Sequence, residues 1–197
     1  MVGKWELLTR KSAWLRANAI WSLLGANNTL RPREWNPALV SLALSRPTAD
    51  SADLSSSLQW LKYNWCADTG RFLEAAQAIH WLISEQEGEF GRWLARWEAS
   101  WFEAFSNNNL AGAREHIEIA ERLAPQKLGQ AARWKAMAAV AALEGRGAEA
   151  QEFAQKAISS LAAESASAGI KRAIEADLIE LLARAKPEAP ADWPSVK

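Results

Sequence analysis

An internal repeat of 38 and then 37 residues runs through the middle of the chain, and its register is set by Gly70, Asn108 and Gly145. Five positions after each of these turn residues the chain carries an alanine, and small or apolar residues follow at nine and twelve positions. The matching residues are Ala75, Ile79 and Leu82, then Ala113, Ile117 and Ala120, then Ala150, Ala154 and Ala157. A unit of this length holds one helical hairpin, so the repeat predicts a row of hairpins.

Helical periodicity extends over nearly the whole chain, whereas alternating strand patterns and Asn-Gly or Asp-Gly turns do not occur. We expect helices over 4–24, 36–45, 51–68, 71–86, 89–106, 109–124, 128–144, 147–163 and 169–185. Glycines at the breaks between these segments suit helix ends that need a positive φ. The last segment, 187–197, contains three prolines and is expected to form a non-helical tail.

The hairpin repeat resembles the tetratricopeptide repeat, which places a large residue in the first helix and a small alanine in the second. The alanines have a physical role, because two helices approach to about 8 Å only where the side chains at their crossing are small. The resemblance implies an all-α, right-handed superhelix. The family usually has a small residue seven positions before the turn. Because this chain has Tyr63, Trp101 and Ala138 there, we expect more irregular packing.

One helical-repeat domain is expected over residues 1–197. Its three hairpins occupy 51–163. N-terminal helices and a linker, 1–50, cover one end of the row, and the helix over 169–185 caps the other. Such caps are needed because the terminal units of a hairpin stack would otherwise expose an apolar face.

Tryptophans are concentrated in the stretch FGRWLARWEASWFEAF, where Trp93, Trp97 and Trp101 lie four residues apart and form one stripe along a helix. Three indoles present roughly 600 Å², which equals the largest apolar patch of typical monomers. The stripe is therefore interpreted as a buried seam between hairpins, with a ligand platform as the alternative. Because Glu98 and Glu103 offset the neighbouring arginines, no nucleic acid partner is expected.

Residues suited to catalysis or metal binding are few. The histidines His80 and His116 and the single cysteine, Cys66, do not have the clustered spacing of a zinc site or of a nucleophile and its base. Cys66 is interpreted as a small buried hydrophobe. Phosphate-loop, zinc-protease and serine-hydrolase motifs do not occur. We therefore expect no enzyme activity, no cofactor and no metal ion.

The first helix supports two interpretations. It carries tryptophans together with Arg10, Lys11 and Arg16, as basic amphipathic helices at membrane surfaces do. The favoured interpretation is packing on the repeats through a face with Trp5, Leu8, Leu15 and the cluster 20–24. No apolar run approaches the ~20 residues that span a bilayer, and the first ten residues have no apolar signal-peptide stretch. A cytoplasmic location is expected, with membrane contact only through 4–24.

The linker LRPREWNPALV, residues 30–40, predicts a helix start, since Asn36 can cap, Pro37 suits the first turn and Trp35 can pack back as an anchor. This linker and the later LEGRGAEA resemble the segment after the membrane domain of some bacterial zinc metallopeptidases of the site-2 protease kind. The matched residues are Arg31, Pro32, Arg33, Glu34, Trp35, Pro37, Leu39 and Val40. The family's zinc-binding helix and membrane spans have no counterpart here. The resemblance implies a helical-repeat module that regulates or recruits for a membrane protease.

The sequence thus predicts a non-catalytic scaffold that binds a protein or peptide partner. In the tetratricopeptide family the first helix of each hairpin usually lines a concave groove. By register, the partner-binding candidates are Trp60, Asn64, Glu98, Phe102 and Lys135. Ordinary helix surface or core is the alternative for each residue. The alternative functions are a membrane-proximal structural module, through 4–24, and small-molecule binding in a tryptophan-lined pocket.

Overall fold

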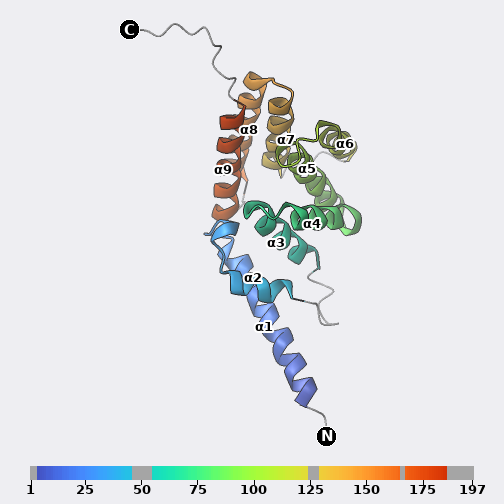
Figure 1. Ribbon diagram of the computed structural model, residues 1–197, viewed down its shortest axis with the longest axis vertical. Helices are drawn as coiled ribbons and strands as arrows, with labels where there is room; N and C mark the ends of the chain where they lie inside the picture. Colours follow the sequence, from blue (N-terminus) through green and yellow to red (C-terminus); the bar gives the residue numbers. More distant parts are fainter. Residues whose placement is uncertain (1–3, 46–54, 124–128, 165–166, 186–197) are drawn as a thin grey trace, which may run out of the picture. The chain divides into compact units, whose positions relative to one another are not determined.

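The computed structural model describes residues 4–45, 55–123, 129–164 and 167–185, of which the backbone alone is described for 4–13 and for Ser55 (Figure 1). These residues form nine α-helices and one 3-10 helix, and none of them lies in a strand. The all-α fold class is therefore confirmed for the part of the chain that the structure describes. The predicted tail, 187–197, and the start of the predicted helix over 51–68 lie outside the described residues.

The helices match the expected ranges to within a few residues at each end. They are α1 (Lys4–Ala26), α2 (Pro37–Leu44), α3 (Ser55–Asp68), α4 (Phe72–Glu85), α5 (Glu89–Phe105), α6 (Leu110–Arg122), α7 (Gln130–Leu143), α8 (Gly147–Ala163) and α9 (Ala168–Arg184). The 3-10 helix η1 (Pro32–Glu34) precedes α2.

Two compact units divide the chain. Unit 1 comprises residues 1–92 together with 166–173, and unit 2 comprises 93–165 together with 174–197. Each unit is described by itself below. The expectation of a single domain over 1–197 stays a prediction.

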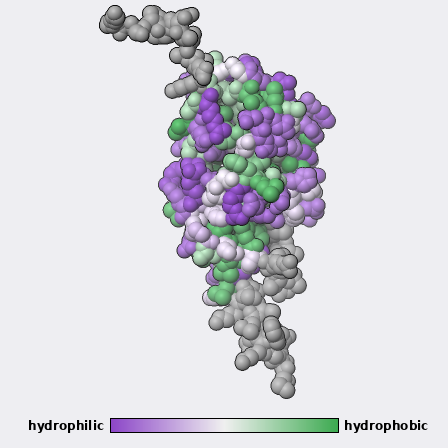
Figure 2. Space-filling model, in the orientation of Figure 1, coloured by the Kyte–Doolittle hydropathy of each residue, from purple (hydrophilic) through white to green (hydrophobic). Residues whose placement is uncertain are grey.

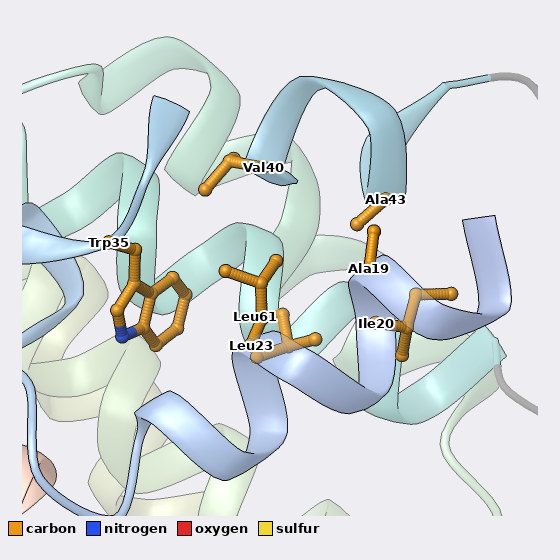
Figure 3. Packing of buried hydrophobic residues seen from close by; sticks show 7 residues of the cluster. All are labelled: Ala19, Ile20, Leu23, Trp35, Val40, Ala43 and Leu61. Carbon is orange, nitrogen blue, oxygen red and sulfur yellow. The ribbon is translucent and has the colours of Figure 1, made fainter. Parts of the chain in front are cut away.

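The core of unit 1 brings together α1, α2, α3 and the residue that follows η1 (Figure 3). It consists of Ala19, Ile20, Leu23, Trp35, Val40, Ala43 and Leu61. Asn36 begins α2 as predicted, since its side-chain oxygen accepts a hydrogen bond from the Ala38 N–H at 2.9 Å. Trp35 is buried directly before this cap, so the predicted anchor is confirmed.

The core face of α1 differs in part from the sequence prediction. Ile20 and Leu23 are buried, but Leu15 and Trp21 are exposed, because α1 turns the side that carries Ala19, Ile20 and Leu23 toward the core. The side chains of Trp5 and Leu8 lie outside the described residues. Arg16, assigned by sequence to the basic face, is buried instead. Its Nε donates to the carbonyl oxygen of Ala43 at 3.0 Å. The Arg16 guanidinium therefore links α1 to the C-terminal half of α2.

The beginning of α9 packs closely on the turn that follows α1 in unit 1. The Ala168 N–H donates to the carbonyl oxygen of Asn28 at 3.2 Å. A Cβ at Gly169 would collide with the backbone oxygens of Asn27 and Leu30. Glycine is therefore needed at this position for close backbone approach, and not only as a helix break.

The predicted repeat register is reproduced at the turns. Gly70, Asn108 and Gly145 have φ values of 74°, 50° and 75°, in the left-handed region that favours glycine and asparagine. The alanine five positions later is fully buried in each case, at Ala75, Ala113 and Ala150. Each hairpin therefore has a left-handed turn followed by a second helix with a buried alanine.

Unit 2 contains the tryptophan stripe, which is buried as the sequence analysis favours. Trp93, Trp97 and Trp101 all lie in the core on α5. The rings of Trp93 and Trp97 meet edge to face with centroids 6.0 Å apart, and Trp101 stacks on Phe105 at 4.4 Å. Edge-to-face and offset stacks are the favourable geometries for aromatic pairs. The stripe therefore fills the interior of unit 2.

Candidate functional site

The five sequence-predicted partner residues fall into two groups. Trp60 and Asn64 are half-buried on α3 in unit 1, where Trp60 meets Tyr63 edge to face at 6.0 Å. Glu98, Phe102 and Lys135 are buried in unit 2. The structure thus brings three of the candidates into one core, and their role in partner binding stays a prediction.

Glu98 on α5 and Lys135 on α7 form a buried ion pair. The Lys135 Nζ donates to Glu98 Oε2 at 2.9 Å, and the two residues are only 4% and 9% exposed. The same ammonium lies 4.8 Å from the ring centroid of Trp101, a cation–π distance. Because both charges are removed from water, each depends on the other for compensation.

Outside the buried ion pair, two side chains that could act in catalysis or metal binding, those of His116 and Cys66, are paired with a neighbouring residue or buried. Among the described residues, no group of three or more His, Cys, Asp or Glu side chains could hold a metal ion. His116 on α6 lies with its Nδ1 3.1 Å from Arg96 Nη1 on α5. Cys66 is buried on α3, and this burial raises the pKa of its thiol in spite of nearby Arg71. A buried thiol with a raised pKa is a poor nucleophile at neutral pH.

The two arginines of the linker motif RPREW both contact one carboxylate on α3, that of Asp68. Asp68 accepts hydrogen bonds from Arg31 Nε at 2.9 Å and from the backbone N–H of Arg33 at 2.8 Å. The Arg33 side chain adds an ion pair at 2.8 Å. Within η1, the Glu34 carboxylate accepts a hydrogen bond from the backbone N–H of Arg31 at 2.8 Å. The two arginines therefore attach the linker to the end of α3.

The Asp68 contacts predict a pH-dependent contribution to stability. Burial alone would raise the pKa of Asp68, but the hydrogen bonds from Arg31 and Arg33 outweigh it and lower the pKa. A lowered folded-state pKa stabilises the fold above the unfolded value of about 3.9, and this gain is lost as pH falls through the folded pKa. We expect Asp68→Asn to cost about 1.5 kcal/mol at pH 7, a modest value because half-exposed Arg33 is screened by water.

Urea denaturation at pH 7 and at pH 3 measures this effect, and the difference between wild type and Asp68→Asn should shrink at the lower pH. Glu74→Gln, which removes the exposed ion pair with Arg71, is the matched control and should change stability far less. An Asp68→Asn penalty that stays constant from pH 7 to pH 3 would contradict the assigned pKa direction.

The indoles of Trp14 and Trp21 form an exposed surface on α1. The sequence analysis did not predict this surface, since it assigned Leu15 and the cluster 20–24, which includes Trp21, to the packing face. Trp14 and Trp21 are 64% and 63% exposed, and Leu15 is exposed beside them. A spacing of seven residues leaves two helical side chains only about 20° apart around the axis. Apolar and polar residues are interspersed over the face drawn in Figure 2. The seven-residue spacing of Trp14 and Trp21 was the sequence signal for this surface.

A pocket of about 270 Å³ lies within unit 2, between α5, α6 and α7. Trp93 and Trp97 from α5 provide its apolar wall. Glu121 from α6, with Gln130 and Arg133 from α7, provides its polar edge. Sequence reasoning proposed a tryptophan-lined pocket but could not name its polar residues, because they come from helices of different repeats.

Comparisons with known proteins give no relative for this chain: no protein-family model, no curated protein and no solved structure matches it. Among the helices that the structure describes, none has the length and apolar character required to cross a bilayer.

Proposed function

We propose that the chain is a non-catalytic, tetratricopeptide-like scaffold that binds an apolar helix of a partner protein on the exposed indole face of α1. The carrying observation is the pair Trp14 and Trp21, two largely exposed tryptophans on one side of the same helix. They present roughly 300 Å² of indole surface, which lies at the lower end of the roughly 300 to 600 Å² covered by the largest apolar patch on a typical monomer. Patches of that size commonly mark interaction sites.

The repeat part of this proposal is supported by matching positions in successive hairpins. Glu98 and Lys135 each lie ten positions before their turn residues, Asn108 and Gly145. Their side chains meet at 2.9 Å. Contact between equivalent positions of neighbouring first helices is what a stack of hairpins requires.

A non-catalytic role is supported by the engagement of the groups that chemistry would need. Asp68 is held by two arginines, Glu98 by Lys135, and the Cys66 thiol is buried with a raised pKa. Each of these side chains is paired or buried within the fold. The resemblance to the repeat domain of membrane zinc peptidases suggests a membrane protease as the class of partner.

Over its described side chains, the surface of α1 favours a protein over a lipid bilayer. From residue 14 to the end of α1, the exposed positions are Trp14, Leu15, Asn18, Trp21, Ser22 and Gly25, all uncharged. Arg16 is buried against Ala43. Helices that bind anionic membranes carry exposed Lys or Arg beside their apolar face. In this part of α1, a neutral face with two indoles two turns apart suits packing against a partner helix.

The test compares affinity capture by wild-type protein and by Trp14→Glu/Trp21→Glu from cells that express the chain. We expect a specific partner to be retained by the wild type and lost by the double variant, because each glutamate places a charge in an apolar contact. Binding of the purified partner, measured by calorimetry, should fall at least tenfold.

Leu73→Glu is the matched control, since Leu73 on α4 of unit 1 is 72% exposed and lies outside the indole face. This control should retain the partner. If the double variant binds every partner of the wild type, the assignment of the α1 face is wrong. Wild-type binding to phosphatidylcholine vesicles that is lost in the double variant would instead favour the membrane-proximal alternative.

A further inference from the structure

The pocket of unit 2 has one cationic side chain at its edge. Arg133 keeps 35% of its side-chain surface exposed and lines the pocket together with the indoles of Trp93 and Trp97. The Nε1 of Trp97 and the Nε of Arg133 are fully buried, so an occupant meets only the part of Arg133 that remains exposed. Because a guanidinium only donates hydrogen bonds, it favours an occupant that brings an oxygen acceptor.

The Arg133 guanidinium is held in place by aromatic rings more than by a carboxylate. Its Cζ lies 4.9 Å from the ring centroid of Trp134 and 5.7 Å from that of Trp97. Its Nη2 is 3.8 Å from Glu121 Oε1, which is longer than a hydrogen bond. The guanidinium is thus oriented by stacking and retains the capacity to bind a carboxylate.

The two charges at the polar edge limit the occupant. A simple anion would be attracted by Arg133 but repelled by Glu121. A simple cation would be attracted by Glu121 but repelled by Arg133. An α-amino acid carries a carboxylate and an ammonium a few bonds apart, a separation comparable with the 3.8 Å between Arg133 and Glu121. Its carboxylate can pair with the Arg133 guanidinium while its ammonium pairs with Glu121.

We propose that this pocket binds a free α-amino acid with an apolar side chain. The side chain packs against the indoles of Trp93 and Trp97, and the zwitterion lies at the polar edge. The volume of about 270 Å³ lies just below the range of about 300 to 1,000 Å³ usual for small-ligand sites, which restricts the occupant to the size of a single amino acid. This site is in unit 2 and is independent of the partner surface on α1 of unit 1.

Calorimetric titration of the full chain tests the proposal with three probes that differ in charge. L-Phenylalanine has both charges, L-phenylalaninamide has no carboxylate and 3-phenylpropanoate has no ammonium. We expect L-phenylalanine to bind at least tenfold more tightly than either analogue. The amide also represents the N-terminal residue of a peptide, so its weak binding distinguishes a free amino acid from a peptide end.

Two variants assign the charges to their residues. Arg133→Gln should abolish the preference for L-phenylalanine over the amide. Glu121→Gln should abolish the preference over 3-phenylpropanoate. These changes in selectivity would not arise from a general loss of stability.

A second pocket of unit 2, of about 180 Å³, supplies the matched control. Arg184 stacks on Phe105 there, with Cζ 4.1 Å from the ring centroid, but donates to the Phe105 carbonyl oxygen and to Glu180. Because these acceptors occupy its donors, Arg184→Gln should leave the titrations unchanged. Equal affinity for all three probes, or no binding of L-phenylalanine and L-leucine at 10 mM, overturns the proposal.

Discussion

Replacing Glu98 by glutamine is expected to destabilise unit 2 by roughly 3 to 5 kcal/mol, the usual cost of removing one partner from a buried ion pair. The ammonium of Lys135 would lose its carboxylate at 2.9 Å while remaining 4% exposed. The ring of Trp101 at 4.8 Å would compensate only in part, since cation–π contacts contribute about 1 to 2 kcal/mol. The loss can be measured by urea denaturation followed by circular dichroism.

A double-mutant cycle separates the interaction energy of Glu98 with Lys135 from the effects of replacing each residue alone. Lys135→Met alone should also destabilise strongly, because the Glu98 carboxylate would lose its ammonium in the core. The double variant Glu98→Leu/Lys135→Met should recover most of the loss, since apolar residues of similar volume often replace buried ion pairs at little cost. A double variant as unstable as the sum of its single variants would show that the ion pair itself is not responsible.

The exposed pair of Glu118 and Arg122 on α6 of the same unit is the matched control. Its atoms are 3.5 Å apart, and both side chains are mostly solvated. Glu118→Gln should change the free energy of unfolding by less than about 0.5 kcal/mol. Because the chain has two compact units, hydrogen exchange of the α5 and α7 amides should be followed as well, so that a loss in unit 2 is not averaged over the chain.

Helix positions and turn residues could be predicted because they depend on local sequence. A left-handed turn needs glycine or asparagine, and Gly70, Asn108 and Gly145 show this need directly in the sequence. Buried alanines follow at a fixed spacing, which periodicity alone indicates. The Asn36 cap and the buried Trp35 were predictable for the same reason.

Burial of charged residues could not be predicted in the same way. Glu98 and Lys135 are polar by type, so register alone placed them on a groove surface, yet they neutralise each other in the core. Arg16 was placed on a basic face, yet it binds the carbonyl oxygen of Ala43, 27 residues away. Each contact joins segments distant in sequence, and periodicity carries no information on which charges will meet.

The exposed indole face of α1 and the polar edge of the unit 2 pocket could not be predicted for a related physical reason. Tryptophan spacing gives the face of a helix but not whether another helix covers that face. Trp97 and Trp14 therefore look similar in sequence, although Trp97 is buried and Trp14 is largely exposed. The opposite charges of Arg133 and Glu121 at the edge of the unit 2 pocket come together only when α6 and α7 are placed side by side.

Enlarging the repeat alanines is expected to disrupt the hairpins of unit 2. Ala113 on α6 and Ala150 on α8 are fully buried, so a leucine at either site forces extra methylene groups into close-packed surroundings. Overpacking of this kind costs roughly 1 to 3 kcal/mol at each site. If the sites are independent, Ala113→Leu/Ala150→Leu should lose roughly 2 to 6 kcal/mol, measured by urea denaturation.

Each site has a control two residues earlier on the same helix. Ala111 and Ala148 are exposed, so Ala111→Leu/Ala148→Leu adds the same methylene groups to the surface and should leave stability almost unchanged. Helix propensity cannot explain a difference between these pairs, because the substitution and the helices are identical. Equal stability of the two double variants would mean that the helices of unit 2 do not pack closely at the alanines, and the repeat would then lose the physical reason for its spacing.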